Sequence, residues 1–315
     1  MLNYAFKRVM LGILILLFTM MVMYVAVYLI PGDPAAVALG PRATPEMKAD
    51  LLARMGLDQP IYIQFSSFIV NILHGDLGLD VWSNREVSAI ISETMPNTMI
   101  LAFASIGWAL ALGIPLGCFS VIYRNSFVDR IIGILSVSFI AIPSFVVAIF
   151  VLLIFAVQLR WLPAIGAGEE GDILSQARAL ILPAFAIGLG WVGYLARMVR
   201  ASMLEVMGEQ HIRTARAFGL SETRVVFRYA LAISLIPVIS LIAVGMGGII
   251  SGSVFAEIIF ARPGIGNLTY NAVTSRNYPV VMGAVMVTTV FYVSITVMAD
   301  LLMAYTDPRV RDVLK

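Results

Sequence analysis

The chain has 315 residues, of which 60% are hydrophobic and only 13% are charged, and its mean hydropathy is +0.93. This composition excludes an ordinary soluble domain and indicates a protein that lies mostly in lipid. The basic residues behind the formal net charge of +2 are dispersed, so they form no basic stripe and we expect no nucleic-acid partner. The single cysteine, Cys118, can form neither an internal disulfide nor a thiolate metal cluster.

Six long stretches lack Asp, Glu, Lys and Arg and have, or approach, the roughly 20 apolar residues of a membrane-spanning helix. They are 9–30, 94–123, 131–159, 179–196, 229–256 and 277–299. Lipid offers backbone groups no other partner, and the alternating pattern of a barrel strand is missing, so all six are expected to be helices. The fourth is the shortest and is expected to continue past Arg197. The sequence therefore predicts an all-α membrane protein with six transmembrane helices.

The distribution of basic residues predicts the orientation of these spans. When successive segments alternate sides, thirteen of the 21 Lys and Arg fall with the two terminal tails, the loop 124–130 and the segment 197–228. That side is expected to be cytoplasmic, so both termini are predicted to be cytoplasmic. An alternative makes 1–38 a cleaved signal peptide. Its apolar run of 22 residues exceeds the roughly 7–15 of a signal core, so we expect residue 1 to remain.

The segment 31–93 is expected to be external and is too polar to span the membrane. Thr44-Pro45-Glu46 is a helix-start signal that predicts a short helix at about 45–55, ended by Gly56. Leu57-Asp58-Gln59-Pro60 predicts the start of a second helix that lies along the surface. This segment is interpreted as a lid over helix ends, as a docking surface for an external partner, or as both.

Small residues and prolines recur inside the predicted spans. Gly113 and Gly117, and Gly248 and Gly252, have the spacing that lets two membrane helices approach closely. Four prolines permit kinks within the spans, although proline is also frequent in membrane helices for other reasons. They are Pro115, Pro143, Pro183 and Pro237.

The segment 197–228 contains the most informative motif. Residues 209–219, Glu-Gln-His-Ile-Arg-Thr-Ala-Arg-Ala-Phe-Gly, combine good helix formers with small residues and alternating charges. Such a helix can approach a partner closely, its Arg side chains can donate to carboxylates or carbonyls there, and Gly219 would end or bend it. By physics alone, a solvated and positively charged loop explains the same residues more simply.

The motif resembles the EAA loop of permeases of ATP-binding-cassette (ABC) importers, in the Arg-Thr-Ala-Arg-Ala-x-Gly form of the dipeptide and oligopeptide branch. Seven further strings resemble the B-type membrane subunit of that branch, in the same order and spacing from residue 1 to about 311. They are Ile30-Pro31-Gly32-Asp33-Pro34, Gly56-Leu57-Asp58-Gln59-Pro60, Gly75-Asp76-Leu77-Gly78, Pro96-Asn97-Thr98, Gly113-Ile114-Pro115-Leu116-Gly117, Pro263-Gly264-Ile265-Gly266 and Asp307-Pro308-Arg309. Each string alone is weak, but eight in register make the resemblance specific.

Three places depart from the pattern of the branch. Ala232 stands where a proline is common, and Thr296 stands where an asparagine often precedes Asp300 by four residues. Leu79-Asp80 stands where a serine is common. These departures bear on local helix geometry and on the class of substrate, and they leave the expected fold unchanged.

The resemblance implies the fold of a type I ABC importer permease. Residues 1–93 would be the first transmembrane helix and an extracytoplasmic cap. Residues 94–305 would be the helix core, with the coupling loop at about 203–228, and 306–315 a cytoplasmic tail. The implied partners are a C-type permease subunit, two cytoplasmic ATPases and an extracytoplasmic solute-binding protein. Di- or oligopeptides are the expected cargo, and nickel complexes, glutathione, opines and oligosaccharides are the alternatives.

The role that the resemblance implies for the coupling loop is mechanical. ATP binding would close the ATPase dimer, and the docked loop would transmit this movement to the helix bundle. The residues that match the motif or lie within it are Arg213, Thr214, Ala215, Arg216, Ala217 and Gly219.

No catalytic residues for nucleotide hydrolysis are found. The three lysines lack the preceding glycine of a P-loop, so we expect this chain to bind no cofactor, with ATP and Mg²⁺ on the partner ATPases. Neither His74 nor His211 is followed by Glu, which excludes a zinc-protease motif, and no metal site is expected. An ATP-independent carrier is the alternative from another class, but the six stretches lack the mid-span charges that it would need.

Glu257 and Asp300 are the acidic residues closest to the membrane interior. An intramembrane carboxylate suggests a gate or a contact with substrate. Both residues lie near the ends of their spans, where water or an arginine such as Arg309 can solvate them. Pairing between helices is therefore the favoured interpretation, and gating stays open.

Overall fold

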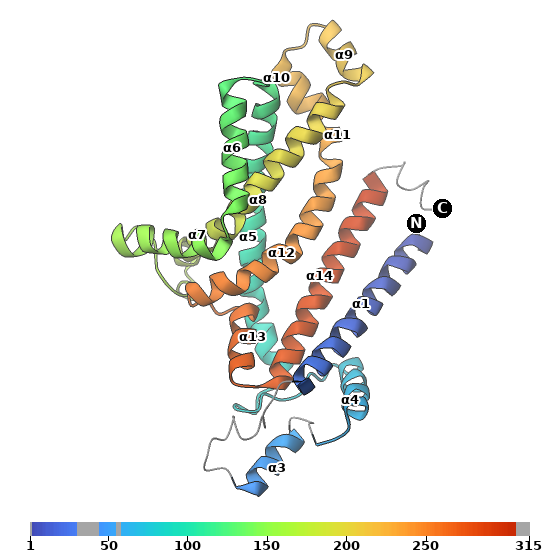
Figure 1. Cartoon of the computed structure of the whole chain (residues 1–315), viewed down its shortest axis with the longest axis vertical. Coiled ribbons are helices and arrows are strands. Elements are labelled where there is room, and N and C mark those ends of the chain that lie inside the picture. The colour runs from blue at the N-terminus through green and yellow to red at the C-terminus, as the bar shows by residue number, and fades with distance from the viewer. Residues whose placement is uncertain (1, 30–43, 55–57, 307–315) are drawn as a thin grey trace. The chain divides into compact units, whose positions relative to one another are not determined.

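The computed structural model describes residues 2–29, 44–54 and 58–306 (Figure 1). In this part of the chain the regular structure is helical, and the only β pairing is an isolated antiparallel bridge between Leu79 and Glu86. The helices are α1 (Leu2–Leu29), α3 (Pro45–Arg54), α4 (Ile61–Leu73), α5 (Val87–Ile122), α6 (Phe127–Ala141), α7 (Ser144–Val151), η1 (Leu152–Gln158), α8 (Ile173–Val206), α9 (Gln210–Ala217), α10 (Glu222–Arg224), η2 (Val225–Ala230), α11 (Leu231–Ser234), α12 (Ile236–Ile259), α13 (Ile265–Thr274) and α14 (Tyr278–Thr306). The elements η1 and η2 are π-helical.

Four helices among the described residues are long and apolar enough to cross a membrane, or five if one bent pair counts as a span. The four lie in α1, α5, α8 and α14. The expected extension of the fourth stretch past Arg197 is confirmed, because α8 continues to Val206. The fifth expected stretch, 229–256, is covered by η2, α11 and α12, where Gly245–Ile259 is a shorter apolar helix.

The third stretch was predicted to be a spanning helix in which Pro143 permits a kink, and the structure shows a sharp break at this proline. Residues 127–141 and 144–158 form two helical arms that meet at an angle of 96°. The bend lies at Pro143, which cannot donate a backbone hydrogen bond and disfavours the helical conformation for the residue before it. Ile142 accordingly has an extended backbone, with φ −86° and ψ 121°. One proline therefore divides an apolar run that composition alone does not divide.

The described residues form two compact units. The N-terminal unit consists of Leu2–Thr98 and Pro263–Val297, and the central unit consists of Met99–Arg262 and the described residues from Met298 onward. Two predicted helices of the cap lie in the N-terminal unit: α3 confirms the helix expected at about 45–55, and α4 begins directly after Pro60. Gly56, the strings at 30–34 and 307–309, and the tail 307–315 lie outside the described residues.

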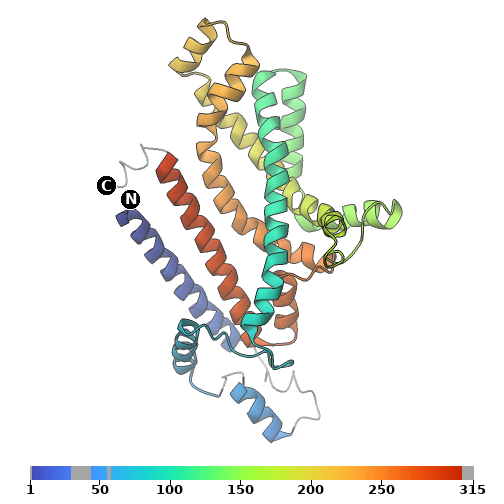
Figure 2. The same cartoon turned by 180° about the vertical axis from the view of Figure 1, so that it is seen from behind.

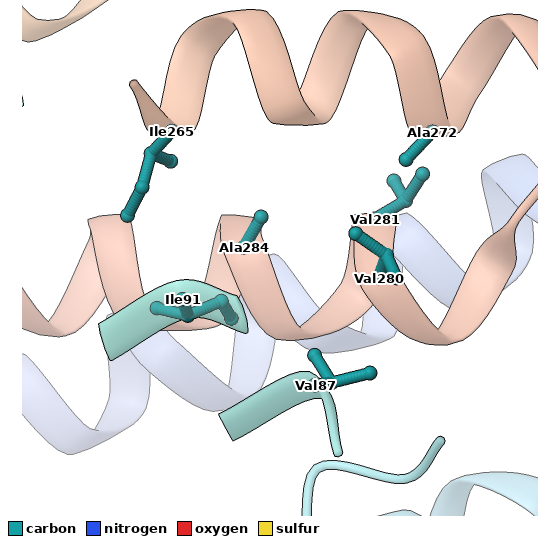
Figure 3. Packing of buried hydrophobic residues seen from close by; sticks show 7 residues of the cluster. All are labelled: Val87, Ile91, Ile265, Ala272, Val280, Val281 and Ala284. Atoms are coloured by element: carbon teal, nitrogen blue, oxygen red, sulfur yellow. The ribbon is translucent and has the colours of Figure 1, made fainter. Parts of the chain in front are cut away.

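The core of the N-terminal unit brings together α5, α13 and α14 (Figure 3). Its buried side chains are Val87, Ile91, Ile265, Ala272, Val280, Val281 and Ala284. Gly283 lies so close to Val87 that an added Cβ would come within 2.6 Å of its side chain, so the glycine permits this packing. Tyr24 of α1 makes edge-on ring contacts with Phe65 and Phe68 of α4.

The central unit is built around α8, which packs against α6, α7 and α12 and also contacts α5 (Figure 2). The expected close approach at Gly113 and Gly117 is confirmed. An added Cβ at either glycine would come within 2.7 Å of a Cβ atom on α8, of Leu195 or Val199 respectively. The second glycine pair behaves differently, because Gly248 packs on the Trp191 ring whereas Gly252 has more room. Helix α8 is thus closely packed from Ala179 to Val206, and the predicted coupling loop begins at its end.

Candidate functional site

The predicted coupling loop forms a separate short helix, α9, directly after α8 (Figure 1). Three residues, 207–209, turn the chain between the two helices, and Glu209 is the extended N-cap of α9. Ile212 is fully buried and Ala215 is 5% exposed, whereas Arg213 and Thr214 are exposed. Because Ile212 and Ala215 are three residues apart, they lie on one face, which packs on η2. The opposite face is left open.

Gly219 ends this helix in the way that its sequence position predicts. Its φ is +76°, in the left-handed region that glycine adopts without a Cβ penalty. The N–H groups of Phe218 and Gly219 donate to the carbonyls of Thr214 at 3.1 Å and Arg216 at 2.9 Å. An added Cβ at Gly219 would meet nothing within 4 Å, so the need for glycine comes from the backbone conformation and not from crowding.

The two arginines of the motif have different environments. Arg216 donates from Nε to Oε1 of Glu222 at 2.7 Å and from Nη2 to Oε2 at 3.3 Å, which ties α9 to α10 within this chain. Arg213 is exposed beside Thr214. The sequence prediction treated both arginines as available to a partner, and the structure shows that Arg216 is already engaged internally. Arg213 is therefore the arginine that α9 presents.

Phe218 completes the exposed face and was not identified from the sequence. Its side chain is 81% exposed, directly before Gly219. Thr214 and Phe218 are four residues apart, as are Arg213 and Ala217, so these residues form a continuous stripe. A large exposed aromatic side chain in such a stripe is typical of a surface that contacts another protein. In the sequence, the available indication of this exposed residue is an aromatic side chain directly before the glycine that ends the helix.

An ion pair with a buried carboxylate joins α8, the helix that leads into α9, to α6. Arg200 of α8 donates from Nε to Oδ1 of Asp129 at 2.9 Å and from Nη2 to Oδ2 at 2.9 Å. Asp129 is only 8% exposed, and it also accepts hydrogen bonds from the hydroxyl of Ser120 and from the backbone N–H of Asn125. This cluster joins α5, the α5–α6 turn, α6 and α8. In the sequence, Arg200 contributes only to the charge distribution that predicts orientation, and no pattern singles out Asp129.

Glu257 and Asp300 are both buried, with exposures of 0% and 9%. The backbone N–H of Arg262 donates to the carbonyl of Glu257 at 2.8 Å, and the Arg262 side chain is also buried. Burial lowers the pKa of Arg262, and the electrostatic attraction of Glu257 opposes that shift. Glu257 thus lies beside a buried arginine of its own unit. Arg309, the other suggested partner, lies outside the described residues.

Two motif strings that are far apart in sequence meet in the N-terminal unit. The hydroxyl of Thr98, from Pro96-Asn97-Thr98, accepts a hydrogen bond at 2.8 Å from the backbone N–H of Ile265, at the start of α13. Ile265 belongs to Pro263-Gly264-Ile265-Gly266. The Thr98 side chain therefore satisfies a backbone donor that the first turn of a helix leaves open.

The departure at Asp80 has a structural role. Asp80 accepts hydrogen bonds from the N–H of Trp82 at 3.0 Å, from the hydroxyl of Ser83 at 2.5 Å and from the side-chain amide of Asn277. Partial burial raises the pKa of Asp80, but these hydrogen bonds outweigh it, so the pKa lies below its usual value. The carboxylate fastens the turn at 80–86 to the α13–α14 connection.

The far end of α8 contains a polar cavity of about 460 Å³. Its lining includes Arg160 and Arg178, and also Glu169 and Asp172, so both signs of charge face the same space. Asp172 accepts a hydrogen bond from the N–H of Leu174 at 2.9 Å and caps α8. This cavity and α9 therefore lie at opposite ends of one helix.

No group of three His, Cys, Asp or Glu side chains that could hold a metal ion occurs among residues 2–29, 44–54 and 58–306.

Comparison with known families and proteins gives concordant results along the chain. Residues 113–312 match the family described as "Binding-protein-dependent transport system inner membrane component". Residues 1–102 match the N-terminal family of the same membrane component. The chain is 35% identical over 312 residues to a "Glutathione transport system permease protein GsiC" of Shigella flexneri and to one of Escherichia coli K12. In both cases the match covers 99% of each chain.

Solved structures support the fold independently. The structure described as "Inward facing conformations of the MetNI methionine ABC transporter" matches with a TM-score of 0.57. The match covers 69% of this chain and 96% of that chain, at 17% identity. A second crystal form of the same transporter gives a TM-score of 0.55 at 19% identity. At such identities the likeness concerns the fold alone.

Proposed function

Because the chain belongs to the family of binding-protein-dependent transport system inner membrane components, we propose that it is the B-type permease subunit of an ATP-driven importer of short peptides. Glutathione, itself a tripeptide with one γ-linked bond, is the first solute to test, since it appears in the names of the relatives. A C-type permease subunit would complete the pathway. Two ATPases with ATP and Mg²⁺ would bind on the cytoplasmic side, one of them at α9, and an extracytoplasmic receptor would deliver the solute.

Membership of the family establishes two parts of the proposed function. The chain is a type I permease of the inner membrane, and it crosses that membrane several times. The solute and the identity of each partner subunit are the proposed parts. The observation that supports the coupling role most directly is the two-faced geometry of α9. Its inner face is fixed to η2 through Ile212 and Ala215, and its outer stripe is unoccupied in this chain.

The geometry sharpens the choice of variant for testing the role of α9. Reversing both motif arginines would place two glutamates side by side, because Arg216 contacts Glu222. That change would disturb the loop itself and would not report on docking alone. Arg213→Glu changes the exposed stripe and leaves the internal ion pair intact. Arg178→Glu is the control, since it reverses an exposed arginine at the opposite end of α8 whose contact is a hydrogen bond to the carbonyl of Trp161 at 3.2 Å and not an ion pair.

The experiment isolates the tagged chain from native membranes under mild solubilisation and identifies the proteins that copurify. We expect the unaltered chain to bring down a second permease and P-loop ATPases. Arg213→Glu should keep the permease and lose the ATPases, and Arg178→Glu should keep both. Retention of the ATPases by Arg213→Glu would contradict the role of α9. A chain that purifies alone with unaltered transport would contradict the importer and would favour an ATP-independent carrier.

The solute is tested separately in proteoliposomes that contain the purified complex and its receptor. We expect ATP-dependent uptake of labelled glutathione, and uptake of a dipeptide and of a nickel complex is measured in parallel. Uptake of the nickel complex alone would overturn the peptide part of the proposal and leave the importer part standing. Uptake without ATP would contradict the importer part.

A further inference from the structure

We propose that the ion pair between Asp129 and Arg200 is the mechanical link between the coupling loop and the helix bundle, so that the α5–α6 hairpin and α8 move with α9 as one body. This inference rests on the proposed function, because it assumes that α9 receives a force from an ATPase. Asp129 and Arg200 are positioning residues in this proposal: they touch neither solute nor ATPase.

The geometry of the contact suits a rigid link. Arg200 donates through two nitrogens to two oxygens of one carboxylate, each at 2.9 Å, and a fork of this kind fixes orientation as well as distance. Arg200 Nε also donates to the hydroxyl of Ser120 at 2.9 Å, and that hydroxyl donates to Asp129. The N–H of Asn125 donates to the second carboxylate oxygen at 3.1 Å. Both oxygens of Asp129 therefore have two donors each.

The position of the contact suits transmission. Arg200 lies six residues before the end of α8, which is about 9 Å along a helix, and three residues then lead into α9. On the other side, Asp129 lies in the first turn of α6 and its bonds include the turn that follows α5. A movement of α9 thus reaches α8 through a short connection and reaches α5 and α6 through the fork.

The Asp129 side chain is only 9% exposed, whereas that of Arg200 is 35% exposed, and this burial of the carboxylate argues against a purely stabilising role. Buried ion pairs are often replaceable by apolar residues without loss of stability, because desolvation offsets their attraction. A forked pair with a buried carboxylate is best accounted for by the one arrangement that it enforces. The exposed pair between Arg85 and Glu93 provides the contrast, since its side chains are 51% and 60% exposed and both lie in the N-terminal unit.

The test uses the double variant Asp129→Asn/Arg200→Gln in the complete complex. Removing one partner would leave the other charge without its counter-ion, whereas the double variant removes both charges; Asn has the size of Asp, and Gln is shorter than Arg. Arg85→Gln/Glu93→Gln is the matched control, because it makes the same change at an exposed pair. The milder variant Arg200→Lys keeps the charge and removes the fork, so it reports on geometry alone even if the double variant assembles poorly.

Two readouts separate a mechanical from a merely structural role. The first is the amount of solute moved per ATP hydrolysed in proteoliposomes. We expect it to fall about tenfold in the double variant and in Arg200→Lys, with ATPases still bound, and to stay constant in the control. An unchanged ratio in either variant of the pair would overturn the proposal.

The second readout does not depend on the solute. Spin labels at Phe127→Cys and Gln210→Cys, two exposed positions on α6 and α9, report the distance between hairpin and coupling loop. We expect little labelling of Cys118, the single native cysteine of this chain, because it is buried. We expect one distance with and without ATP in the otherwise unaltered complex, and a nucleotide-dependent or broadened distance in the double variant. A distance that changes with ATP in the otherwise unaltered complex would overturn the link. Absence of bound ATPase would instead overturn the proposed function.

Discussion

The two arginine–carboxylate pairs near the end of α8 have similar chemistry and different surroundings. Arg216 and Glu222 join α9 to α10 with side chains that are 40% and 53% exposed. Arg200 and Asp129 join α8 to α6 with side chains that are 35% and 9% exposed. Water competes for the first pair and largely cannot reach the carboxylate of the second. The comparison teaches that the exposure of a polar contact, more than its distance, sets the consequence of removing it.

Asp129→Ala is expected to have the largest effect. It leaves the guanidinium of Arg200 without its carboxylate in a mostly buried site, which costs about 3 kcal/mol, at the lower end of the usual range because Arg200 is partly exposed. Thermal unfolding of the purified complex in detergent measures the loss. Glu222→Ala is the control at the exposed pair. Equal losses from the two changes would contradict the comparison.

Asp300 tests whether a second buried carboxylate follows the same rule. Asp300→Asn is expected to reduce the yield of assembled complex, because removing the charge of a buried carboxylate that interacts with its surroundings costs about 1–3 kcal/mol. Copurification of the second permease measures assembly, and solute uptake is measured beside it. Thr296→Asn is the control, since the Thr296 hydroxyl donates only locally, to Tyr292 at 2.9 Å. Normal assembly with lost uptake would favour the gating interpretation.

Asp80 is partly buried, and so lies between the buried Asp129 and the exposed Glu222. Its contribution to stability should depend on pH. Its folded pKa is lowered, so the stabilisation is fully present above the unfolded pKa of about 4 and is lost as pH falls through the lower folded value. Hydrogen exchange at amides 80–87, corrected for its intrinsic pH dependence, measures this effect. Asp80→Asn should reduce protection at neutral pH, and its difference from the unaltered chain should shrink as pH falls below about 4. Equal protection at neutral pH would contradict the assigned role.

Arg216→Gln should have the smallest effect. An exposed ion pair contributes roughly 0–1 kcal/mol, and Ile212 and Ala215 still hold α9 on η2. Thermal unfolding should therefore shift little, and less at high salt. A loss comparable to that of Asp129→Ala would show that exposure is not the deciding factor.

The sequence predicts the local features of the fold and misses those that join distant segments. The cap helix at Pro45, the extension of α8, the close approach at Gly113 and Gly117 and the left-handed end at Gly219 all depend on neighbouring residues or on fixed spacing. The bend at Pro143 was available as a signal, yet proline is tolerated in many membrane helices, so its presence alone does not decide between a kink and a break.

The candidate site shows the same division. The motif located α9 and its terminating glycine, but only the structure shows that Arg216 is engaged and that Arg213 and Phe218 are presented. Asp129 and Arg200 are 71 residues apart. Each lies in a segment whose basic residues were used only to predict the side of the membrane that it faces. No local pattern pairs two side chains at such a separation. Their contact follows from how α6 packs on α8.

The bend at Pro143 also affects whether the chain crosses the membrane an even or an odd number of times. Each arm of the bent pair has 15 residues, or about 22 Å of helix, which is shorter than the roughly 30 Å of a hydrocarbon core. One crossing by the two arms together gives six crossings with the five other predicted spans, and both termini then share a side. A return of the second arm to its starting side would make the number odd and separate the termini. The side on which the chain ends is thus decided at a single break of two residues.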